Sequence, residues 1–487
     1  MATGFDTTKK YAPDSLGSVL ILGLGKSGKA ASTYCAALIG SRVDSCTVYA
    51  GAANEANESF ACDLRDQGAT VLFDTEQVEG SYDVCIASPG ISENSAFYQA
   101  AVSCSTEVIS EVEFAWRESD AGSVWLAITG TNGKTTTTAL AAHILQTCGK
   151  NASAVGNIGD TCLEAVANGN TACYVAEVSS YQLASTKRFK PDVAVLLNIT
   201  PDHLKWHGSF EAYAQAKQKI YANCDSSCTV VLDATNDVVR EFVKAMRVDG
   251  SREYAYVPMG TAQGISGNMC DACGSENAAY LNADGVLCVD FKGAHHELCA
   301  AADLQIKGEH NASNALAAAA GVVALGCADE GIIRGLVSFE PIAHRIEPCG
   351  SVAGVACYND SKATNVDATL KALAAFGDDK PVVLLGGDDK GTDLTELVEQ
   401  ADHHCKAVVC FGAAEPRFLQ AFKAASIPVY EAQRMKDAFD AALSCTAPGD
   451  IIVLSPACAS FDEFSGYPER GNVFKDLVAQ RSRERGA

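Results

Sequence analysis

The segment 127–136, Ala-Ile-Thr-Gly-Thr-Asn-Gly-Lys-Thr-Thr, constrains the fold more than any other part of the sequence. It lies between an apolar run that predicts a buried strand and residues 137–145, whose apolar spacing predicts a helix. A strand, a glycine-rich turn and a helix form a phosphate cradle, because the N–H groups of the turn and the positive end of the helix dipole face the anion. Lys134 would meet the β- and γ-phosphates and the Thr135 hydroxyl would meet Mg²⁺. We therefore expect ATP binding, although Ile128 stands where the usual motif has a glycine; a chance Gly-Lys-Thr turn is the alternative.

Length and composition predict a globular protein with several domains. A chain of 487 residues corresponds to roughly three domains, and 48% hydrophobic with 20% charged residues is typical of globular proteins. The net charge of −23 argues against nucleic-acid binding, because phosphates would be repelled. The 21 cysteines are spread over predicted strands and helices, which indicates reduced core residues of a cytoplasmic protein. No signal core and no apolar run of roughly 18–20 residues is present, so we expect a soluble chain without a membrane span.

A second glycine-rich turn follows the apolar segment 18–22. It reads Gly-Leu-Gly-Lys-Ser-Gly over residues 23–28 and leads into a predicted helix, as in dinucleotide-binding folds. A nicotinamide site would also need an acidic residue after the second strand, which we place at 45–49, and none is there. We therefore interpret the turn as a diphosphate site for another nucleotide, with a nicotinamide dinucleotide as the alternative. With a further strand and turn over 83–91, it predicts a first domain of residues 1–121.

The predicted central domain, residues 122–340, continues the alternation of strands and helices. Glu177 ends an apolar strand, where a carboxylate in an α/β ATPase is a natural Mg²⁺ ligand; a buried, ion-paired glutamate is the alternative. Asp202 and His203 follow another strand, at the edge where open α/β sheets hold ligands. Residues 252–304 are rich in turns and predict inserted hairpins.

Four residues of zinc-binding type lie in this insert, Cys270, Cys273, His295 and His296. Their spacing fits no zinc-finger pattern well. A zinc site is therefore the weaker interpretation of the insert.

The third predicted domain, residues 341–487, contains apolar strands over 382–387, 407–412 and 451–456. Each strand ends in a turn of small residues, and helical patterns lie between them, which predicts another doubly wound sheet. The predicted fold class is therefore α/β, with three doubly wound, Rossmann-like domains. The central one is a P-loop-type ATPase with a mainly parallel sheet.

Several motifs, taken in order and spacing, resemble the Mur ligases and their folylpolyglutamate relatives. They are Gly-Thr-Asn-Gly-Lys-Thr-Thr at 130–136, Glu-Val-Ser-Ser at 177–180, Asn198-x3-Asp202-His203, His310-Asn311-x2-Asn314-Ala315 and His344-Arg345. In the third domain, segments 359–365, 386–391, 454–462 and 464–474 resemble the family members that add D-glutamate. The sequence lacks the Asp-Asn-Pro-Arg segment of the members that add diaminopimelate or lysine.

The resemblance implies an ATP-dependent amide ligase of peptidoglycan precursor synthesis, a pathway of cell wall biogenesis. Its substrates would be UDP-N-acetylmuramoyl-L-alanine, D-glutamate and ATP, and an acyl phosphate would be the intermediate. Two Mg²⁺ ions and a carbamylated Lys217 would serve as cofactors. We expect a cytoplasmic monomer that binds no nucleic acid and in which the third domain closes on its ligands.

The resemblance also assigns roles residue by residue. The implied catalytic residues are Lys134, Glu177, His203, Lys217 and Arg345. The implied ATP-binding residues are Gly130, Thr131, Asn132, Gly133, Lys134, Thr135, Thr136, Asn311, Asn314, Arg345 and Asp360. The UDP-substrate would contact Gly23, Gly25, Lys26, Ser27, Gly28, Ser88 and Asn157. D-Glutamate would contact Thr364, Lys390, Ser455 and Phe461, and the metal ligands would be Thr135, Glu177, His203 and the Lys217 carbamate.

The first domain departs from the family pattern. The D-glutamate-adding members usually carry an Asp-Thr pair after the second strand for the uracil end, whereas residues 48–51 here read Val-Tyr-Ala-Gly. The uracil contacts are therefore left open. A folylpolyglutamate-type ligase and a redox protein are rival interpretations, and a non-catalytic regulator is disfavoured because Lys134, Glu177, His203 and Lys217 are all present.

Overall fold

The structure, a computed structural model, describes residues 4–249, 254–261, 275–306, 308–377, 379–389 and 391–485, without the side chains of 246–249. These residues form two compact units, one of residues 1–304 and 312–339 and the other of 305–311 and 340–487. The strands of the described residues fall into three sheets, which are mostly parallel, and this confirms the predicted α/β fold class. The predicted domain boundaries at 121/122 and 340/341 stay a prediction.

The first sheet is parallel and has the strand order β3-β2-β1-β4-β5 in the described chain. Its helix α3 packs on one face, through Phe97 and Tyr98, and α1, α2 and α4 pack on the other. The strands are β1 (Gly17–Leu22), β2 (Val43–Tyr49), β3 (Thr70–Leu72), β4 (Tyr82–Ala87) and β5 (Ser105–Ser110). The helices are α1 (Lys26–Ala36), α2 (Glu55–Asp66), α3 (Ala96–Cys104) and α4 (Glu111–Glu118).

The second sheet, in the same unit, has the order β14-β13-β12-β11-β10-β9-β6-β8-β7 in the described chain. It is parallel from β7 to β12, and β13 and β14 add antiparallel strands at one edge. The predicted hairpins thus extend this sheet. Its strands are β6 (Val124–Thr129), β7 (Ala152–Gly156), β8 (Cys173–Glu177), β9 (Val193–Leu196), β10 (Thr229–Asp233), β11 (Ala255–Gly260), β12 (Ala278–Leu281), β13 (Val286–Phe291) and β14 (Ala294–Ala300).

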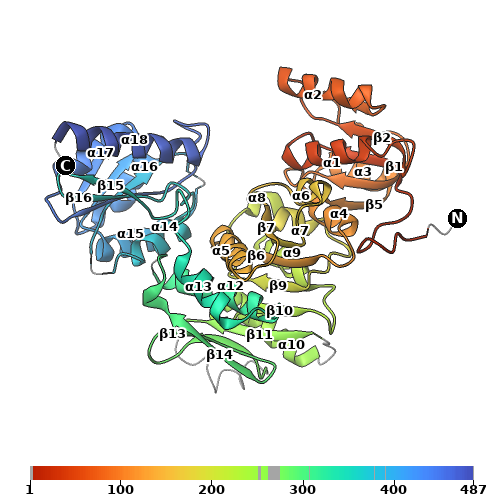
Figure 1. The fold of residues 1–487 in the computed structure, drawn as a ribbon. Helices are drawn as coiled ribbons and strands as arrows, with labels where there is room; N and C mark the ends of the chain where they lie inside the picture. Colours follow the sequence, from red (N-terminus) through yellow and green to blue (C-terminus); the bar gives the residue numbers. More distant parts are fainter. Residues whose placement is uncertain are drawn as a thin grey trace. The chain divides into compact units, whose positions relative to one another are not determined.

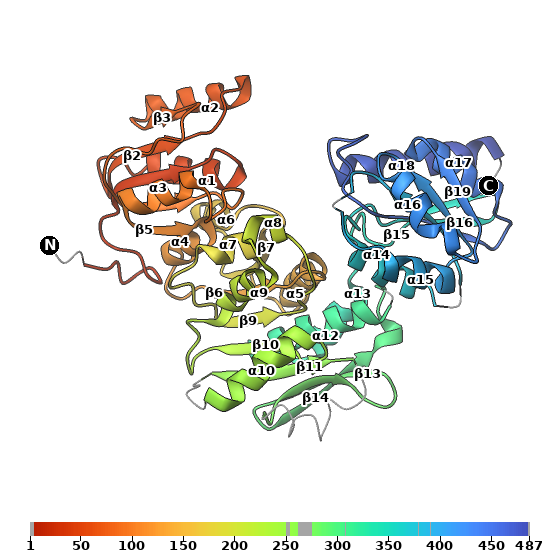
Figure 2. The same ribbon diagram turned by 180° about the vertical axis from the view of Figure 1, so that it is seen from behind.

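Helices cover both faces of the second sheet. Figure 1 shows α5, α12 and α13 over one face, where Gly321 of α12 lies close enough to Leu126 that a Cβ would touch that side chain. Figure 2 shows α9 and α10 over the other face, where Tyr213 and Val239 join the core. These helices are α5 (Lys134–Thr147), α6 (Cys162–Asn168), α7 (Ser180–Ala184), α8 (Leu204–His207), α9 (Phe210–Gln218), α10 (Asp237–Asp249), α12 (Glu309–Ala324) and α13 (Asp329–Ser338). Short 3-10 turns are η1 (Lys219–Tyr221) and η2 (Ala301–Asp303).

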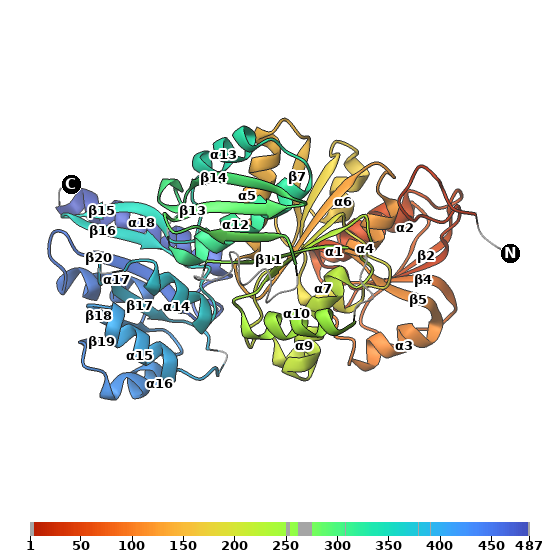
Figure 3. The same ribbon diagram turned by 90° about the horizontal axis from the view of Figure 1, so that it is seen from below.

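The second unit holds the third sheet, with the order β15-β16-β20-β17-β18-β19, which can be followed in Figure 3. All its neighbouring strands are parallel except β15 and β16. Two cores flank it: Phe439 and Phe474 lie on one face, and Leu373 and Phe418 on the other. The strands are β15 (Glu347–Val352), β16 (Val355–Asn359), β17 (Val382–Gly386), β18 (Ala407–Phe411), β19 (Val429–Ala432) and β20 (Ile451–Ala457). The helical segments are α14 (Val366–Ala374), α15 (Thr395–His404), α16 (Glu415–Ala421), η3 (Phe422–Ala424), α17 (Met435–Ser444) and α18 (Tyr467–Arg485).

Within the described part of the insert, no group of side chains is spaced to hold zinc. Cys270 and Cys273 lie outside the described residues. The imidazole of His295 pairs with Asp290, and that of His296 pairs with Asp329 at the start of α13. These two histidines therefore have carboxylate partners of their own.

Candidate functional site

The glycine-rich turn 130–133 joins β6 to the amino end of α5, as the sequence predicts. Gly133 precedes the helix with a φ of 84°, in the left-handed region that favours glycine. A Cβ at Gly133 would collide with Oδ1 of Asn314, which also accepts a 3.3 Å hydrogen bond from the Thr137 hydroxyl. Gly133 and Asn314, two of the predicted ATP-binding residues, therefore meet at the start of α5.

Two residues that the sequence reasoning did not assign to the site hold this turn in place. The side-chain amide of Asn198, after β9, donates to the Asn132 carbonyl at 3.1 Å and accepts from the Asn132 N–H at 2.9 Å. The Tyr213 hydroxyl lies 2.8 Å from Oγ1 of Thr131. The position of Asn198 at the carboxyl end of a parallel strand was the signal that could have found it.

The two predicted catalytic lysines converge on one carbonyl of the turn. Lys134 Nζ donates to the Gly130 carbonyl at 2.8 Å and to the Thr131 carbonyl at 2.7 Å. Lys217 Nζ, from α9, donates to the same Gly130 carbonyl at 2.7 Å and lies over the Tyr213 ring. Lys217 is buried, and burial together with the positive charge of Lys134 holds the pKa of Lys217 well below its usual range.

Glu177, the last residue of β8, is also buried. Its Oε1 accepts a 3.0 Å hydrogen bond from the side-chain amide of Asn157, and the Asn157 N–H donates to the Glu177 carbonyl. Its Oε2 is buried and has no hydrogen-bond partner in the described part of the chain. An ionised oxygen left in this state is costly, because burial removes water without supplying a donor. A carboxylate oxygen of this kind suits Mg²⁺, a hard cation that prefers oxygen ligands.

His203 directly precedes α8 and has a left-handed backbone conformation with a φ of 54°. Its Nε2 lies 3.5 Å from Oδ2 of Asp202, and its ring packs against Tyr181. Asp202 and Glu177 both act electrostatically on Lys217, which places the two carboxylates in the surroundings of the lysine. No group of three His, Cys, Asp or Glu side chains within the described ranges is spaced to hold a metal, and the predicted ligand set contains only two residues of these types.

The predicted UDP-substrate residues of the first sheet also come together. The Ser88 hydroxyl donates to the Gly23 carbonyl at 3.3 Å, and a Cβ at Gly28 would collide with that same carbonyl, so α1 packs tightly on the turn. Lys26 Nζ donates to the Gly159 carbonyl, in the turn that also carries Asn157. Because Asn157 binds Glu177, this turn connects the two sheets of the first unit.

In the second unit the structure brings Asp360 and Ser455 together. The Ser455 hydroxyl donates to Oδ2 of Asp360 at 2.7 Å, and both residues are buried. Burial raises the pKa of Asp360 to about 7, against the lowering effects of Ser455 and Arg345. Phe461 is 70% exposed. Of the other predicted residues of this unit, Thr364 and Asn311 are half-buried and Lys390 lies outside the described residues.

Arg470, on α18, binds the backbone of the segments that carry Asp360, Ser455 and Phe461. It was not among the predicted site residues. Its guanidinium is buried and donates to the carbonyls of Cys458, Ala459 and Ser361. These carbonyls lie in the segments that carry Ser455, Phe461 and Asp360. Arg470 lies on the buried side of α18, with Phe474 and Val478, and its burial is seen only in the fold.

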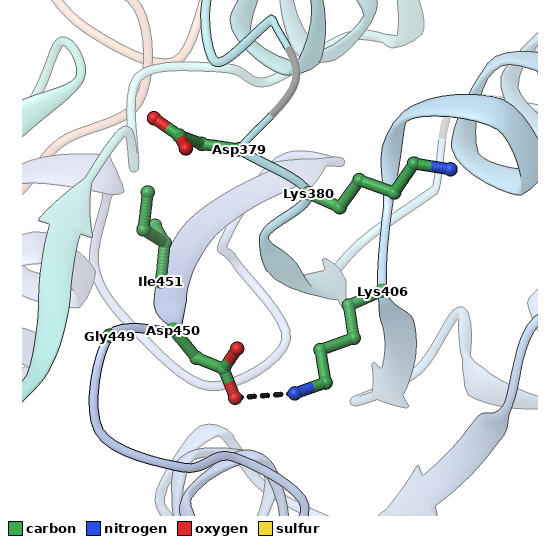
Figure 4. Close-up of a pocket in the computed structure, with 6 residues that line it drawn as sticks. All are labelled: Asp379, Lys380, Lys406, Gly449, Asp450 and Ile451. Carbon is green, nitrogen blue, oxygen red and sulfur yellow. Dashed lines mark hydrogen bonds and ion pairs between the residues drawn. The ribbon is translucent and has the colours of Figure 1, made fainter.

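Two cavities in the described part of the chain lie away from these residues. One of about 340 Å³ lies at the amino ends of β17, β18 and β20, opposite the carboxyl ends that carry the predicted residues, and its Lys406 and Asp450 form an ion pair (Figure 4). Another, of about 870 Å³, lies along α3 and β5 in the first unit. Among the described residues, no helix is both long and apolar enough to cross a membrane.

Comparisons with known proteins identify the family. Residues 128–322 match the Mur ligase middle domain, and residues 344–458 match the Mur ligase glutamate ligase domain. The chain is 37% identical over 474 residues to a UDP-N-acetylmuramoylalanine--D-glutamate ligase of Koribacter versatilis, covering 96% of this chain and 98% of the relative. The enzyme of the same name from Latilactobacillus sakei is 38% identical over 475 residues, covering 95% of this chain and 97% of the relative.

Solved structures agree on the fold. A pseudomurein peptide ligase type C from Methanothermus fervidus gives a TM-score of 0.57 at 17% identity, covering 94% of this chain and 99% of that one. MurF from Acinetobacter baumannii gives 0.56 at 18% identity, covering 84% and 92% of the two chains. These two likenesses concern the fold alone, whereas the family assignment rests on the matched domains and the full-length relatives. The chain belongs to the Mur ligase family.

Proposed function

We propose that this chain is an ATP-dependent ligase that adds D-glutamate to UDP-N-acetylmuramoyl-L-alanine in peptidoglycan precursor synthesis. The observation that carries the proposal is the match over 96% of the chain to a relative named for this reaction. The geometry agrees, because a phosphate-binding turn, a buried carboxylate with one unsatisfied oxygen and a buried lysine lie in one place. ATP use follows from the family itself.

The chemistry requires activation, because a carboxylate and an amine do not form an amide unaided in water. The L-alanyl carboxylate attacks the γ-phosphorus of ATP, a C–O–P bond forms and the bond to the β-phosphate oxygen breaks, which gives an acyl phosphate and ADP. The D-glutamate amine then attacks the acyl carbon. The C–N bond forms, inorganic phosphate leaves and the amine loses a proton. Both steps bring anions together, so positive groups must lie where charge develops.

The turn 130–136 would hold the triphosphate through its N–H groups and the amino end of α5. Lys134, now bonded to two carbonyls of the turn, has the flexible stem needed to reach the β- and γ-phosphates. Asn314 would meet the nucleotide beside Gly133, and Asn311 would do so from one turn earlier on α12. Arg345 would meet the γ-phosphate and Asp360 the ribose.

Two Mg²⁺ ions would be held by Thr135, Glu177, His203 and Lys217, the last as a carbamate. When bound, the ions would neutralise the triphosphate and the acyl group that meets it. The unsatisfied Oε2 of Glu177 and the burial of Lys217 support this assignment. Carbamylation consumes an uncharged amine and CO₂ and yields a carboxylate-like group, which Mg²⁺ prefers to an ammonium.

The substrates would be held at the carboxyl ends of the sheets. The Gly23–Gly28 turn, Ser88 and Asn157 would bind the UDP-substrate. Thr364, Lys390, Ser455 and Phe461 would bind D-glutamate, with the hydroxyls and the Phe461 backbone fixing its orientation. The Ser455 hydroxyl donates to Asp360 in this structure, so without a change of partner it would act on a ligand as an acceptor. We also propose that the protein works as a cytoplasmic monomer.

Phosphate release tests the proposal. The purified chain, with ATP, Mg²⁺ and UDP-N-acetylmuramoyl-L-alanine, is expected to release phosphate with D-glutamate and not with L-glutamate, L-lysine or diaminopimelate. Release with another of these amino acids would retain the ligase chemistry and refute the D-glutamate assignment. Absence of release with all four would refute the proposed reaction.

A further inference from the structure

We propose that Asp74 and Thr75, in the loop after β3, recognise the nucleoside end of the UDP-substrate. The inference rests on the proposed function, because it concerns the same substrate. It assigns a recognition role to a loop to which the sequence alone gave none.

The end of β2 lacks the carboxylate that nucleotide-binding folds of this type place there. In a fold of this type the diphosphate lies at the first glycine turn, and an acidic residue at the end of the second strand binds the nucleoside. Here β2 ends at Tyr49 and continues as Ala50-Gly51, none of which has a carboxylate. A carboxylate contact to the nucleoside would therefore come from another part of the same sheet edge.

The loop after β3 is tied to that edge by hydrogen bonds across three strand ends. The Gly23 N–H donates to the Tyr49 carbonyl at 2.8 Å, and the Ala50 N–H donates to the Leu72 carbonyl at 2.8 Å. The Asp74 N–H then donates to the Gly51 carbonyl at 2.9 Å. Two strand spacings of about 4.8 Å place the loop roughly 10 Å from the glycine turn. This is the side to which β2 and β3 extend the binding edge.

The Asp74 side chain faces the backbone of the β2 loop. Its Oδ1 accepts a 3.2 Å hydrogen bond from the Ala53 N–H. Its Oδ2 has no hydrogen-bond partner in the portion of the chain that the structure describes, and the residue is exposed. Asp74 has a φ of 54°, a conformation that aspartate and asparagine tolerate better than most residues. One oxygen is therefore fixed, and the other is available.

Thr75 supplies the complementary group. Its Oγ1 accepts a 3.2 Å hydrogen bond from the Gln77 N–H, which orients the hydroxyl and leaves its hydrogen to be donated. A uracil ring has one N–H donor between two carbonyl acceptors, and ribose has hydroxyl donors. A carboxylate oxygen can accept from the ring N–H or from a ribose hydroxyl, and the threonine hydroxyl can donate to a uracil carbonyl. An aspartate and a threonine side by side thus match this ligand chemistry.

The plain alternative is that Asp74 only caps the β2 loop through Ala53. Asp74→Asn separates the two roles, because asparagine keeps an oxygen for the Ala53 N–H and tolerates the same backbone. Its NH₂ group would replace the available oxygen, so that a donor would face the ligand where an acceptor is needed. A capping role predicts no change in this variant, and a recognition role predicts weaker binding.

The experiment measures the affinity of the full chain for UDP, CDP and 2′-deoxy-UDP by calorimetry, with KM for UDP-N-acetylmuramoyl-L-alanine alongside. We expect Asp74→Asn to weaken UDP binding by about tenfold to a hundredfold, the usual range for a hydrogen bond to a charged group. We expect Thr75→Val to weaken UDP binding as well, independently of Asp74. The matched control is Glu76→Gln, which removes an exposed carboxylate from the same loop and leaves UDP binding unchanged.

CDP and 2′-deoxy-UDP show whether Asp74 accepts from the uracil N–H or from a ribose hydroxyl. A contact to the uracil N–H makes the wild-type protein prefer UDP to CDP, and a contact to ribose makes it prefer UDP to 2′-deoxy-UDP; Asp74→Asn erases whichever preference exists. Wild-type affinities in both variants would overturn the inference. That outcome is separate from the proposed function, which is tested by the phosphate release of the wild-type chain with D-glutamate and the other three amino acids.

Discussion

Asn157 and Glu177 are joined side chain to side chain, with the amide of Asn157 donating to Oε1 of Glu177 at 3.0 Å. The bond fixes the carboxylate so that its other oxygen is the buried, unsatisfied one. A residue of the proposed UDP-substrate site thereby orients a residue of the proposed metal site. Together with the hydrogen bond from the Asn157 N–H to the Glu177 carbonyl, the side-chain bond connects the two proposed sites within the first unit.

Glu177→Gln is expected to lower kcat by at least about 100-fold, because the amide loses the charge that a cation requires. The affinity for Mg²⁺-ATP, measured by titration, should fall as well. Glu211→Gln on α9 is the control, since Glu211 is exposed and lies in the same unit. A Glu177→Gln enzyme with wild-type turnover would contradict the metal assignment.

Lys217→Ala is expected to be nearly inactive and to recover part of its activity with a small carboxylic acid such as acetate. The added acid would supply the oxygen ligand that the carbamate provides. Phosphate release is measured with and without acetate. The control Lys150→Ala, at an exposed lysine, should keep wild-type activity under both conditions. Full activity of Lys217→Ala without acetate would remove the carbamate from the mechanism.

Gly133→Ala tests the geometry of the phosphate-binding turn. Gly133 and Gly149 have similar positive φ values, 84° and 78°, but a Cβ at Gly133 collides with Asn314 while one at Gly149 meets open space. Gly149→Ala therefore reports the backbone strain alone, about 1–2 kcal/mol. Gly133→Ala should lose ATP affinity by at least about tenfold beyond that control, as measured by nucleotide titration. Equal ATP affinities for the two variants would show that the turn tolerates the side chain.

Glu111 predicts a pH dependence of stability. It begins α4, accepts a 2.6 Å hydrogen bond from the Leu163 N–H of α6, and is buried with Oε2 unsatisfied. Burial raises its pKa from 4.5 to about 7. The folded state therefore keeps a proton that the unfolded chain loses above about pH 4.5, so its contribution to stability falls as the pH rises from 4.5 to 7 and then levels off.

Glu111→Gln should remove this fall and stabilise the protein at pH 8 by up to about 3 kcal/mol relative to wild type, with little gain at pH 4.5. Thermal unfolding at the two pH values measures the difference. Glu211→Gln, with its exposed carboxylate, should show no such pH-dependent gain. A gain of the same size at both pH values would refute the titration as its cause.

Much of the fold could be predicted from local patterns. The apolar runs ending at Leu22, Thr129 and Gly386 are strands, and the glycine turns that follow them lie where parallel strands end. Gly133 shows why such motifs are informative, because its backbone conformation is one that glycine alone adopts without strain. The antiparallel strands β13 and β14 were expected only as hairpins, since nothing local states which sheet edge a hairpin joins.

The sequence by itself determined the residue types of the site, because phosphate binding and cation binding demand particular groups at short, fixed spacings. Only the tertiary structure decided which of them meet. Lys217 reaches Gly130 across 87 positions of the chain, and Ser455 reaches Asp360 across 95. Burial was likewise decided by the fold, since the same lysine on an exposed helix would keep its ordinary pKa. Contacts between distant positions depend on how strands are ordered and helices packed, and no local spacing encodes that order.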